Sequence, residues 1–104
     1  RAGLAASLCR AVSESLVPRT MAAAEELGYK KIAVAGGVAA NSRIRADFAA
    51  AAEKAGARLF VPPLRLCGDN AAMIGCQGYY EFLAGHTAGP ELNAYAAMPL
   101  EKQI

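Results

Sequence analysis

Apolar residues recur three or four positions apart in three stretches of the chain, and two short apolar runs lie between these stretches. The three- to four-residue spacing is typical of amphipathic helices, and a short apolar run between turn residues is typical of a strand buried in a sheet. Glycines close the first two helical stretches, as expected at helix C-termini. The pattern predicts a helix over 1–28, a strand over 31–35, a helix over 41–55, a strand over 58–61, a helix over 69–84 and an irregular tail over 85–104.

The order helix-strand-helix-strand-helix indicates the α/β class, because strands that alternate with helices form parallel sheets. The length of 104 residues fits one domain over 1–104. We expect the strand at 31–35 to be fully buried. Pro18 lies inside the first predicted helix, and its ring clashes with the carbonyl of Glu14, so we expect a kink or a break there.

Composition narrows the possibilities. The apolar fraction of 55% is high enough for a packed core and too high for a disordered chain. The net charge of +2 argues against a free-standing nucleic-acid-binding arm. Cys9, Cys67 and Cys76 form no CxxC pair, so neither a disulfide framework nor a zinc knuckle is indicated, and reduced thiols in the cytoplasm are the default. No apolar run is long enough to span a membrane.

The strongest chemical signal follows the first predicted strand. Gly36 and Gly37 allow a ligand to approach the backbone, and the next helix start offers unpaired N–H groups that suit a phosphate. Asn41 adds an amide that can bond a ribose, a phosphate or a base edge. The alternative is an ordinary glycine turn, with Asn41 or Ser42 as a helix cap.

A second signal, CGDNAAMIG, starts at Cys67 and leads into the third predicted helix. Asp69 is either the N-cap of that helix or a metal ligand. Because Asn41 and Asp69 both follow carboxyl ends of neighbouring strands, we expect them to face one crevice. We expect Cys67 to be a small buried residue, and His86 to lie in a solvated loop.

The third predicted helix is rich in small residues. Ala71, Gly75 and Gly78 fall on one face, and two glycines inside a helix are otherwise unfavourable. A close-packed neighbour or a ligand would explain them, and we favour the neighbour. We expect Tyr79 and Tyr80 to straddle the edge of the core.

Taken together, AVAGGVAANSRIR and LCGDNAAMIG resemble the tRNA adenosine threonylcarbamoyltransferase family (TsaD). The opening LAASLCRAVSESLVPRT resembles the preceding helix of that family, and LNAYAAMPL resembles its tail. The resemblance covers nearly the whole chain but only the last third of a full-length member. It implies an incomplete C-terminal subdomain of an actin-like ATPase, a ribonuclease H-like fold. The start at Arg1 rather than Met also suggests an excised piece.

By this resemblance, the complete protein transfers a threonylcarbamoyl group from threonylcarbamoyl-adenylate to adenosine 37 of ANN-decoding tRNAs. Asn41 matches the asparagine that contacts the adenylate, and Gly36 and Gly37 match the nucleotide-loop glycines. Asp69 matches a ligand of the active-site metal, iron or zinc. The other metal ligands of the family are two histidines of an upstream HxxxH motif, which this chain lacks and which His86 does not match.

The resemblance also implies partners: a TsaB-like inactive paralogue and a TsaE-like ATPase. We expect the chain alone to be inactive and to hold no stoichiometric metal. We also expect it to self-associate, through an unpaired strand edge at Lys31–Ala35 or through helix exchange at Pro18. Two alternatives are an O-carbamoyltransferase of the hydrogenase-maturation or nodulation type, against which the second motif argues, and a non-catalytic binding module.

Overall fold

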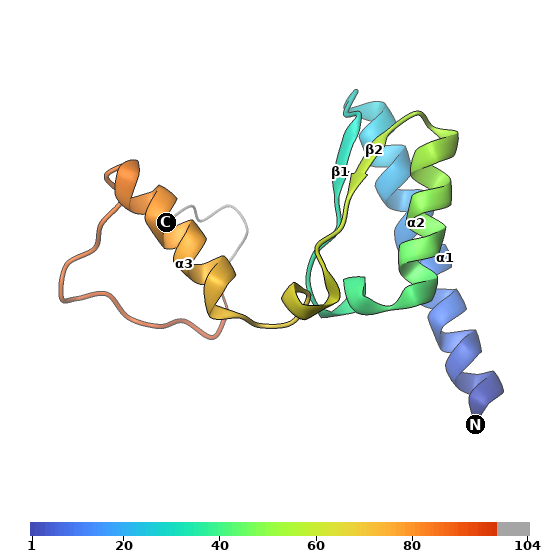
Figure 1. Ribbon diagram of the computed structural model, residues 1–104, viewed down its shortest axis with the longest axis horizontal. Helices are drawn as coiled ribbons and strands as arrows, with labels where there is room; N and C mark the ends of the chain where they lie inside the picture. Colours follow the sequence, from blue (N-terminus) through green and yellow to red (C-terminus); the bar gives the residue numbers. More distant parts are fainter. Residues whose placement is uncertain (98–104) are drawn as a thin grey trace. The chain divides into compact units, whose positions relative to one another are not determined.

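A computed structural model of the chain describes residues 1–97 and confirms the α/β class (Figure 1). These residues belong to two compact units, the first spanning Arg1–Asp69 and the second beginning at Asn70. Within residues 1–97, the first unit contains two helices, two strands and two short three-ten helices, and the second contains one helix. The elements are α1 (Ala2–Glu26), β1 (Lys31–Ala33), η1 (Gly37–Ala40), α2 (Ser42–Lys54), β2 (Arg58–Phe60), η2 (Leu64–Leu66) and α3 (Ala71–Leu83).

The first two helices end in the same way, each at a glycine that leads into a strand. Gly28 after α1 and Gly56 after α2 have φ angles of 72° and 63°, a left-handed conformation that glycine adopts without steric cost. The next backbone N–H, that of Tyr29 or Ala57, donates to the carbonyl five residues earlier at 2.8 Å. These turns reverse the chain direction, so that β1 and β2 can run parallel.

Helix α1 continues without interruption through Pro18, so the expectation of a break there is wrong. Thr20, two residues later, donates its hydroxyl to the carbonyl of Leu16 at 2.9 Å. Val17, beside the proline, is buried in the core. This packing of the apolar face holds the helix together across the position where Pro18 cannot donate a hydrogen bond.

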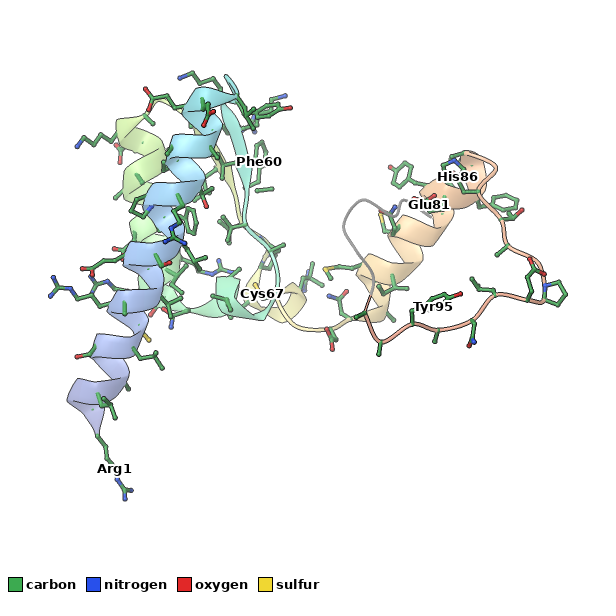
Figure 2. The ribbon with its side chains drawn as sticks, turned by 180° about the vertical axis from the view of Figure 1, so that it is seen from behind. Arg1, Phe60, Cys67, Glu81, His86 and Tyr95 are labelled. Atoms are coloured by element: carbon green, nitrogen blue, oxygen red, sulfur yellow. The ribbon has the colours of Figure 1, made fainter. Side chains whose placement is uncertain are left out.

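The sheet has two parallel strands, and one of its faces is uncovered in the described part of the chain. Ile32 pairs with Leu59 on the face toward the helices, and Ile32 is only 6% exposed. Ala33 pairs with Phe60 on the opposite face, where the Arg58 guanidinium lies 4.8 Å from the Phe60 ring centroid (Figure 2). The expectation that the first strand is fully buried is therefore wrong, since helices cover only one face.

Helices α1 and α2 lie side by side on the same side of this sheet, as Figures 1 and 2 both show. Their contact is the centre of the core, formed by Val17 of α1 with Ile44 and Phe48 of α2. Five partly buried residues complete it: Val12, Met21, Val34, Ala51 and Leu59. The core thus fixes the α2 N-terminus and the residues that precede it.

The second unit has no buried residue in its helix. Tyr79 and Tyr80 are both exposed and contact each other edge to face, so the prediction that they straddle a core edge is wrong. Nothing lies within 4 Å of where a Cβ would stand on Gly75 or Gly78, so the expected close-packed neighbour is not among the described residues. Beyond α3 the chain has neither helix nor strand through Ala97, and the rest of the expected tail lies outside the described residues.

None of the helices within residues 1–97 is both long enough and apolar enough to cross a bilayer. This includes α1, which has 25 residues but carries charged side chains along its length.

Candidate functional site

The loop after β1 begins with a glycine in a conformation that other residues rarely adopt. Gly36 has φ 89° and ψ 177°, and the chain then forms η1 before it reaches Asn41. The sequence predicted a simple turn here and gave no sign of the three-ten helix. No atom lies within 4 Å of where a Cβ would stand on Gly36 or Gly37, so the space beside both glycines is open within the described structure.

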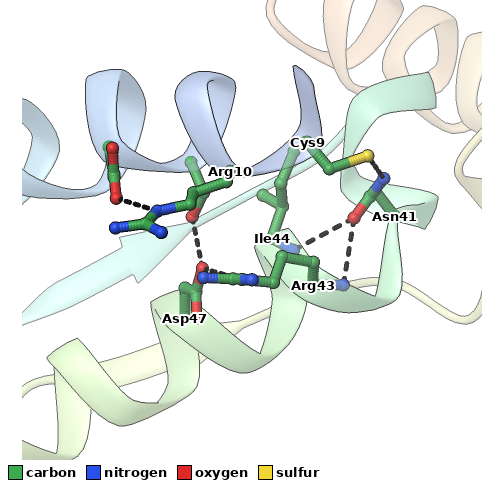
Figure 3. Close-up of polar contacts among 8 residues, drawn as sticks. Cys9, Arg10, Asn41, Arg43, Ile44 and Asp47 are labelled. Carbon is green, nitrogen blue, oxygen red and sulfur yellow. Dashed lines mark hydrogen bonds and ion pairs between the residues drawn. The ribbon is translucent and has the colours of Figure 1, made fainter. Parts of the chain in front are cut away.

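Asn41 occupies the N-cap position of α2, where the sequence allowed either Asn41 or Ser42. Its Oδ1 accepts hydrogen bonds from the backbone N–H groups of Arg43 at 3.0 Å and Ile44 at 3.2 Å. Its Nδ2 donates to Sγ of Cys9 on α1 at 3.3 Å (Figure 3). The Oδ1 of the amide is therefore bonded to the helix backbone, and within residues 1–97 the NH₂ group donates only to a thiol, which is a weak acceptor.

This cap changes the expected anion site. Two of the N–H groups predicted to be unpaired at the start of α2 are bonded to Asn41. Within residues 1–97, the N–H groups of Gly37 and Val38 in the preceding loop have no partner. The open backbone donors thus lie in the loop itself rather than in the first turn of α2.

Apolar residues border this loop on its sheet side. A cavity of about 250 Å³ lies between α1, β1 and α2. Val34, Ala35, Val38 and Ala39 contribute to its lining, together with side chains from the core. The loop therefore has an apolar flank next to its open backbone donors.

The sequence gave no role to Arg45, yet this side chain connects the loops that follow the two strands. Its Nε donates to the carbonyl of Ala39 at 2.5 Å. Its Nη2 donates to the carbonyl of Pro62 at 2.6 Å and lies 3.0 Å from Sγ of Cys67. One signal pointed to it: a basic residue in the first turn of a helix is unfavourable beside the positive end of the helix dipole, so another contact must hold it there.

Cys67, at the end of η2, is buried with 2% of its surface exposed, which confirms the expected small buried role. Its Sγ lies 3.5 Å from the carbonyl oxygen of Pro63, and Figure 2 labels it beside the short helical turns of the first unit. Cys67 and Arg45 together thus tie the loop after β2 to the start of α2.

Asp69 lies two residues beyond Cys67 and is exposed. It does not cap α3, so that expectation is wrong. Asn70 occupies the N-cap position, and its Oδ1 accepts the N–H of Met73 at 2.8 Å. The reason is a shift of one residue: α3 begins at Ala71, so the residue immediately before it is the one that reaches the open N–H groups. The Asp69 carboxylate has no hydrogen-bond partner among the described residues.

The described residues do not form a complete metal site. No group of three or more His, Cys, Asp or Glu side chains in residues 1–97 could hold an ion together. His86 lies in an exposed loop, as expected, and its Nδ1 is 2.6 Å from Oε2 of Glu81. This contact is the main cause that holds the pKa of Glu81 below its ordinary value. His86 is thus engaged with the preceding helix, α3.

The structure therefore places Gly36, Gly37 and Asn41 in one loop and Asp69 at the end of the next. No contact joins Asn41 to Asp69, and neither lines a described cavity. The side chain of Arg45 links the two loops that contain them.

An open glycine loop and an exposed carboxylate thus follow the two parallel strands of an α/β protein, at the end of the sheet where ligands of this class of fold bind. The chain belongs to the TsaD family, the tRNA N6-adenosine threonylcarbamoyltransferases, whose family model matches residues 2–76. This range includes both loops.

Individual relatives agree with the family match. A tRNA N6-adenosine threonylcarbamoyltransferase of Moorella thermoacetica is 49% identical over 100 residues, covering 96% of this chain and 29% of the relative. That of Thermosynechococcus vestitus is 50% identical over 99 residues, covering 95% of this chain and 28% of the relative. That of Anaeromyxobacter dehalogenans is 49% identical over 100 residues, with 95% and 30% covered. The chain thus spans less than a third of the length of these relatives.

Proposed function

We propose that this chain supplies the second half of the nucleotide site, and one metal ligand, of an enzyme that transfers threonylcarbamoyl from threonylcarbamoyl-adenylate to adenosine 37 of ANN-decoding tRNAs. The observation that carries the proposal is the family match over residues 2–76, which spans both candidate loops. The relatives named for this activity are about three times longer than the chain. The remaining substrate contacts therefore come from outside these 104 residues, and the chain alone is inactive.

In this proposal the loop from Gly36 to Asn41 holds the adenylate. Its backbone lets a phosphate approach closely, because neither Gly36 nor Gly37 has a neighbour within 4 Å of the Cβ position. The Asn41 side chain cannot rotate freely, since its Oδ1 is held by two backbone N–H groups. Its NH₂ group gives up only a thiol contact when it binds a ligand oxygen, which is the stronger acceptor. The cap thus orients the amide before substrate arrives.

Asp69 contributes a carboxylate ligand to an iron or zinc ion in this proposal. An exposed carboxylate without a hydrogen-bond partner is free to coordinate a metal. The described residues supply this one ligand and no cluster of three. Two histidines from the remainder of the enzyme would complete the set, and the ion would supply Lewis-acid chemistry.

The complete protein adopts an actin-like ATPase fold in this proposal, and the parallel pair β1–β2 is part of its ribonuclease H-like sheet. It works in the cytoplasm with a TsaB-like paralogue and a TsaE-like ATPase. Three free cysteines in the described structure are compatible with a reducing compartment.

The test uses a chimera in which residues 1–104 replace the matching section of the Moorella thermoacetica relative. We expect this chimera to form threonylcarbamoyladenosine in tRNA, read by mass spectrometry of tRNA digests. Asn41→Ala should weaken its binding of a non-hydrolysable adenylate by about 1–3 kcal/mol, the usual effect of losing a buried polar partner. The 104-residue chain by itself should form no modified adenosine.

Asn41→Ala also removes a helix cap, so a second variant separates the two roles. Asn41→Ser keeps an oxygen that can cap α2 but removes the amide donor. It should bind the adenylate as weakly as Asn41→Ala while the helix stays capped. Asn93→Ala, which changes an exposed asparagine in the tail, is the matched control and should leave binding unaltered. Unchanged affinity in both Asn41 variants, measured by calorimetry, would remove Asn41 from the site.

A further inference from the structure

Arg45 hydrogen-bonds the loop after β1 and the loop after β2 at the same time. Its guanidinium reaches Ala39, two residues before the N-cap of α2, and Pro62, two residues after the end of β2. The same Nη2 that bonds Pro62 also lies 3.0 Å from Sγ of Cys67, two residues before Asp69. One side chain therefore bridges segments that are 17 and 22 residues away in the sequence.

The groups that Arg45 contacts have little access to water as an alternative hydrogen-bond partner. Cys67 is almost fully buried, and the guanidinium is itself partly buried. Carbonyl groups at the ends of short helices and strands need a donor, and a charged donor forms a stronger bond than a neutral one. The planar fork of arginine directs Nε and Nη2 along different lines, so that one side chain satisfies both loops together.

We propose that Arg45 is a positioning residue for the reaction: it holds the Gly37–Asn41 loop and the Pro62–Asp69 loop in one fixed relation. The roles of the two loops rest on the proposed function, whereas their mechanical coupling through Arg45 does not. Arg45 does not touch the substrate in this account. It acts by keeping the Asn41 amide and the Asp69 carboxylate at a constant separation while the nucleotide and the metal bind.

The first test measures hydrogen exchange of single backbone amides by NMR in the 104-residue chain. Four amides report on the two loops, because each donates one bond within a loop: Ala39 and Asn41 in the first, and Leu66 and Cys67 in the second. Arg45→Lys keeps the charge but loses the fork. We expect exchange at all four amides to accelerate together, by about tenfold or more, as the loops lose a charge-assisted hydrogen bond.

Two controls separate this coupling from a general loss of stability. Arg43→Lys changes an arginine on the same helix. Its Nε donates to Asp47, also on α2, and to neither loop. It should leave the four amides unchanged. Ile44→Val trims the buried core next to Arg45 and lowers global stability, while every hydrogen bond from Arg45 to the two loops stays in place. Exchange at the four amides in Arg45→Lys must exceed that in Ile44→Val, after both are normalised to amides in the middle of α2.

Two results would overturn the inference. One is exchange in Arg45→Lys that rises no more than in Ile44→Val. The other is acceleration of one loop while the second keeps its protection, since independent loops are not coupled. Thiol labelling gives a second reading: Cys67 should react about tenfold faster in Arg45→Lys, whereas the exposed Cys76 should react at the same rate.

The kinetic test uses the chimera. A residue that positions two loops should affect alignment more than binding, so Arg45→Lys should lower kcat about 10–100-fold and change KM much less. A rise in KM at constant kcat would contradict the positioning role. If the parent chimera forms no modified adenosine, the proposed function fails, and the exchange experiment still decides whether Arg45 couples the loops.

Discussion

The hydroxyl of Ser13 on α1 donates a hydrogen bond to Oδ2 of Asp47 on α2 at 2.6 Å, and Nε of Arg43 donates to the same oxygen at 3.0 Å (Figure 3). Ser13 is the buried polar side chain of the described core, with 2% of its surface exposed. This bond fixes the register of the two helices that carry the core, and through α2 it fixes the position of the candidate site. The Ser13 hydroxyl, followed by Arg43, holds the pKa of Asp47 below its ordinary value of 3.8.

The Asp47 carboxylate gives the first prediction, on pH. A carboxyl whose pKa is lowered by folding stabilises the folded chain above its ordinary pKa, and this stabilisation disappears as the pH falls through the lower folded-state value. We therefore expect Asp47→Asn to lower the Tm at pH 7. The Tm difference from the parent chain should shrink progressively below about pH 4. Thermal unfolding of both chains, followed by circular dichroism in a series of buffers from pH 2 to pH 7, measures this Tm difference.

The control for this prediction is Glu53→Gln, which neutralises an exposed carboxylate on the same helix. It should show a much smaller Tm difference at every pH. A Tm difference for Asp47→Asn that stays constant from neutral to acidic pH would mean that the hydrogen bonds to Asp47 do not depend on its charge.

The second prediction concerns the glycine pair. Gly36 has φ 89° and ψ 177°, a region that is nearly restricted to glycine, whereas Gly37 has no positive φ. Since no described atom lies within 4 Å of either Cβ position, we expect any effect of alanine to be conformational rather than steric. We expect Gly36→Ala to lower the free energy of unfolding by about 1–3 kcal/mol. Gly37→Ala should stay within about 0.5 kcal/mol of the parent in urea unfolding. Equal losses at the two positions would contradict this explanation.

Much of this fold is predictable because its signals are local. Gly28 and Gly56 end α1 and α2, and Asn41 caps the start of α2, each through contacts within five residues along the chain. The remainder depends on packing. Whether Ala33 is buried depends on what covers the second face of the sheet, and the contacts of Arg45 join segments far apart in sequence.

The wrong prediction that Asp69 caps α3 shows, for one residue, the difference between what local sequence predicts and what only the structure shows. A polar pair at a helix start indicates a cap, but the position at which the helix begins decides which member caps it. Asn70 takes that role because α3 begins at Ala71. The sequence could therefore name the candidate carboxylate, but the structure was needed to show that it is not used by the helix.

The third prediction concerns metal content. In the chimera, Asp69→Ala should lower bound iron or zinc to well below one ion per chain and reduce tRNA modification. A single carboxylate is a poor site for a transition metal, so the 104-residue chain should hold neither ion stoichiometrically. Elemental analysis of purified protein measures both. Glu53→Ala, a change of an exposed carboxylate on α2, is the control. Full occupancy in the Asp69→Ala chimera would exclude Asp69 as a ligand.

The fourth prediction concerns self-association. In β1, the N–H of Val34 bonds to Phe60 of β2, so the alternate N–H groups of Lys31 and Ala33 point to the free edge of the strand. Edges of this kind pair with other chains, and we expect the 104-residue chain to be a dimer or larger at micromolar concentration. Ala33→Pro removes one edge donor without removing a bond to β2, and it should shift the mass by light scattering toward the monomer.

Ala33→Thr keeps the edge donor and is the matched control, so it should associate like the parent chain. A monomeric parent chain with a cooperative thermal transition would rule out this association. An Ala33→Pro variant that associates as strongly as the parent would instead exclude the β1 edge as the contact.

The two glycine junctions, at Gly28 and Gly56, have a consequence for insertions and deletions. Each junction sets the first residue of a strand, and side chains alternate between faces along a strand. One residue added between Gly28 and Lys31, if absorbed by the strand, would turn Ile32 away from the helices and Ala33 toward them. Changes in length should therefore be tolerated in the exposed segment from 86 to 97. They should be selected against at the two short connections between helix and strand.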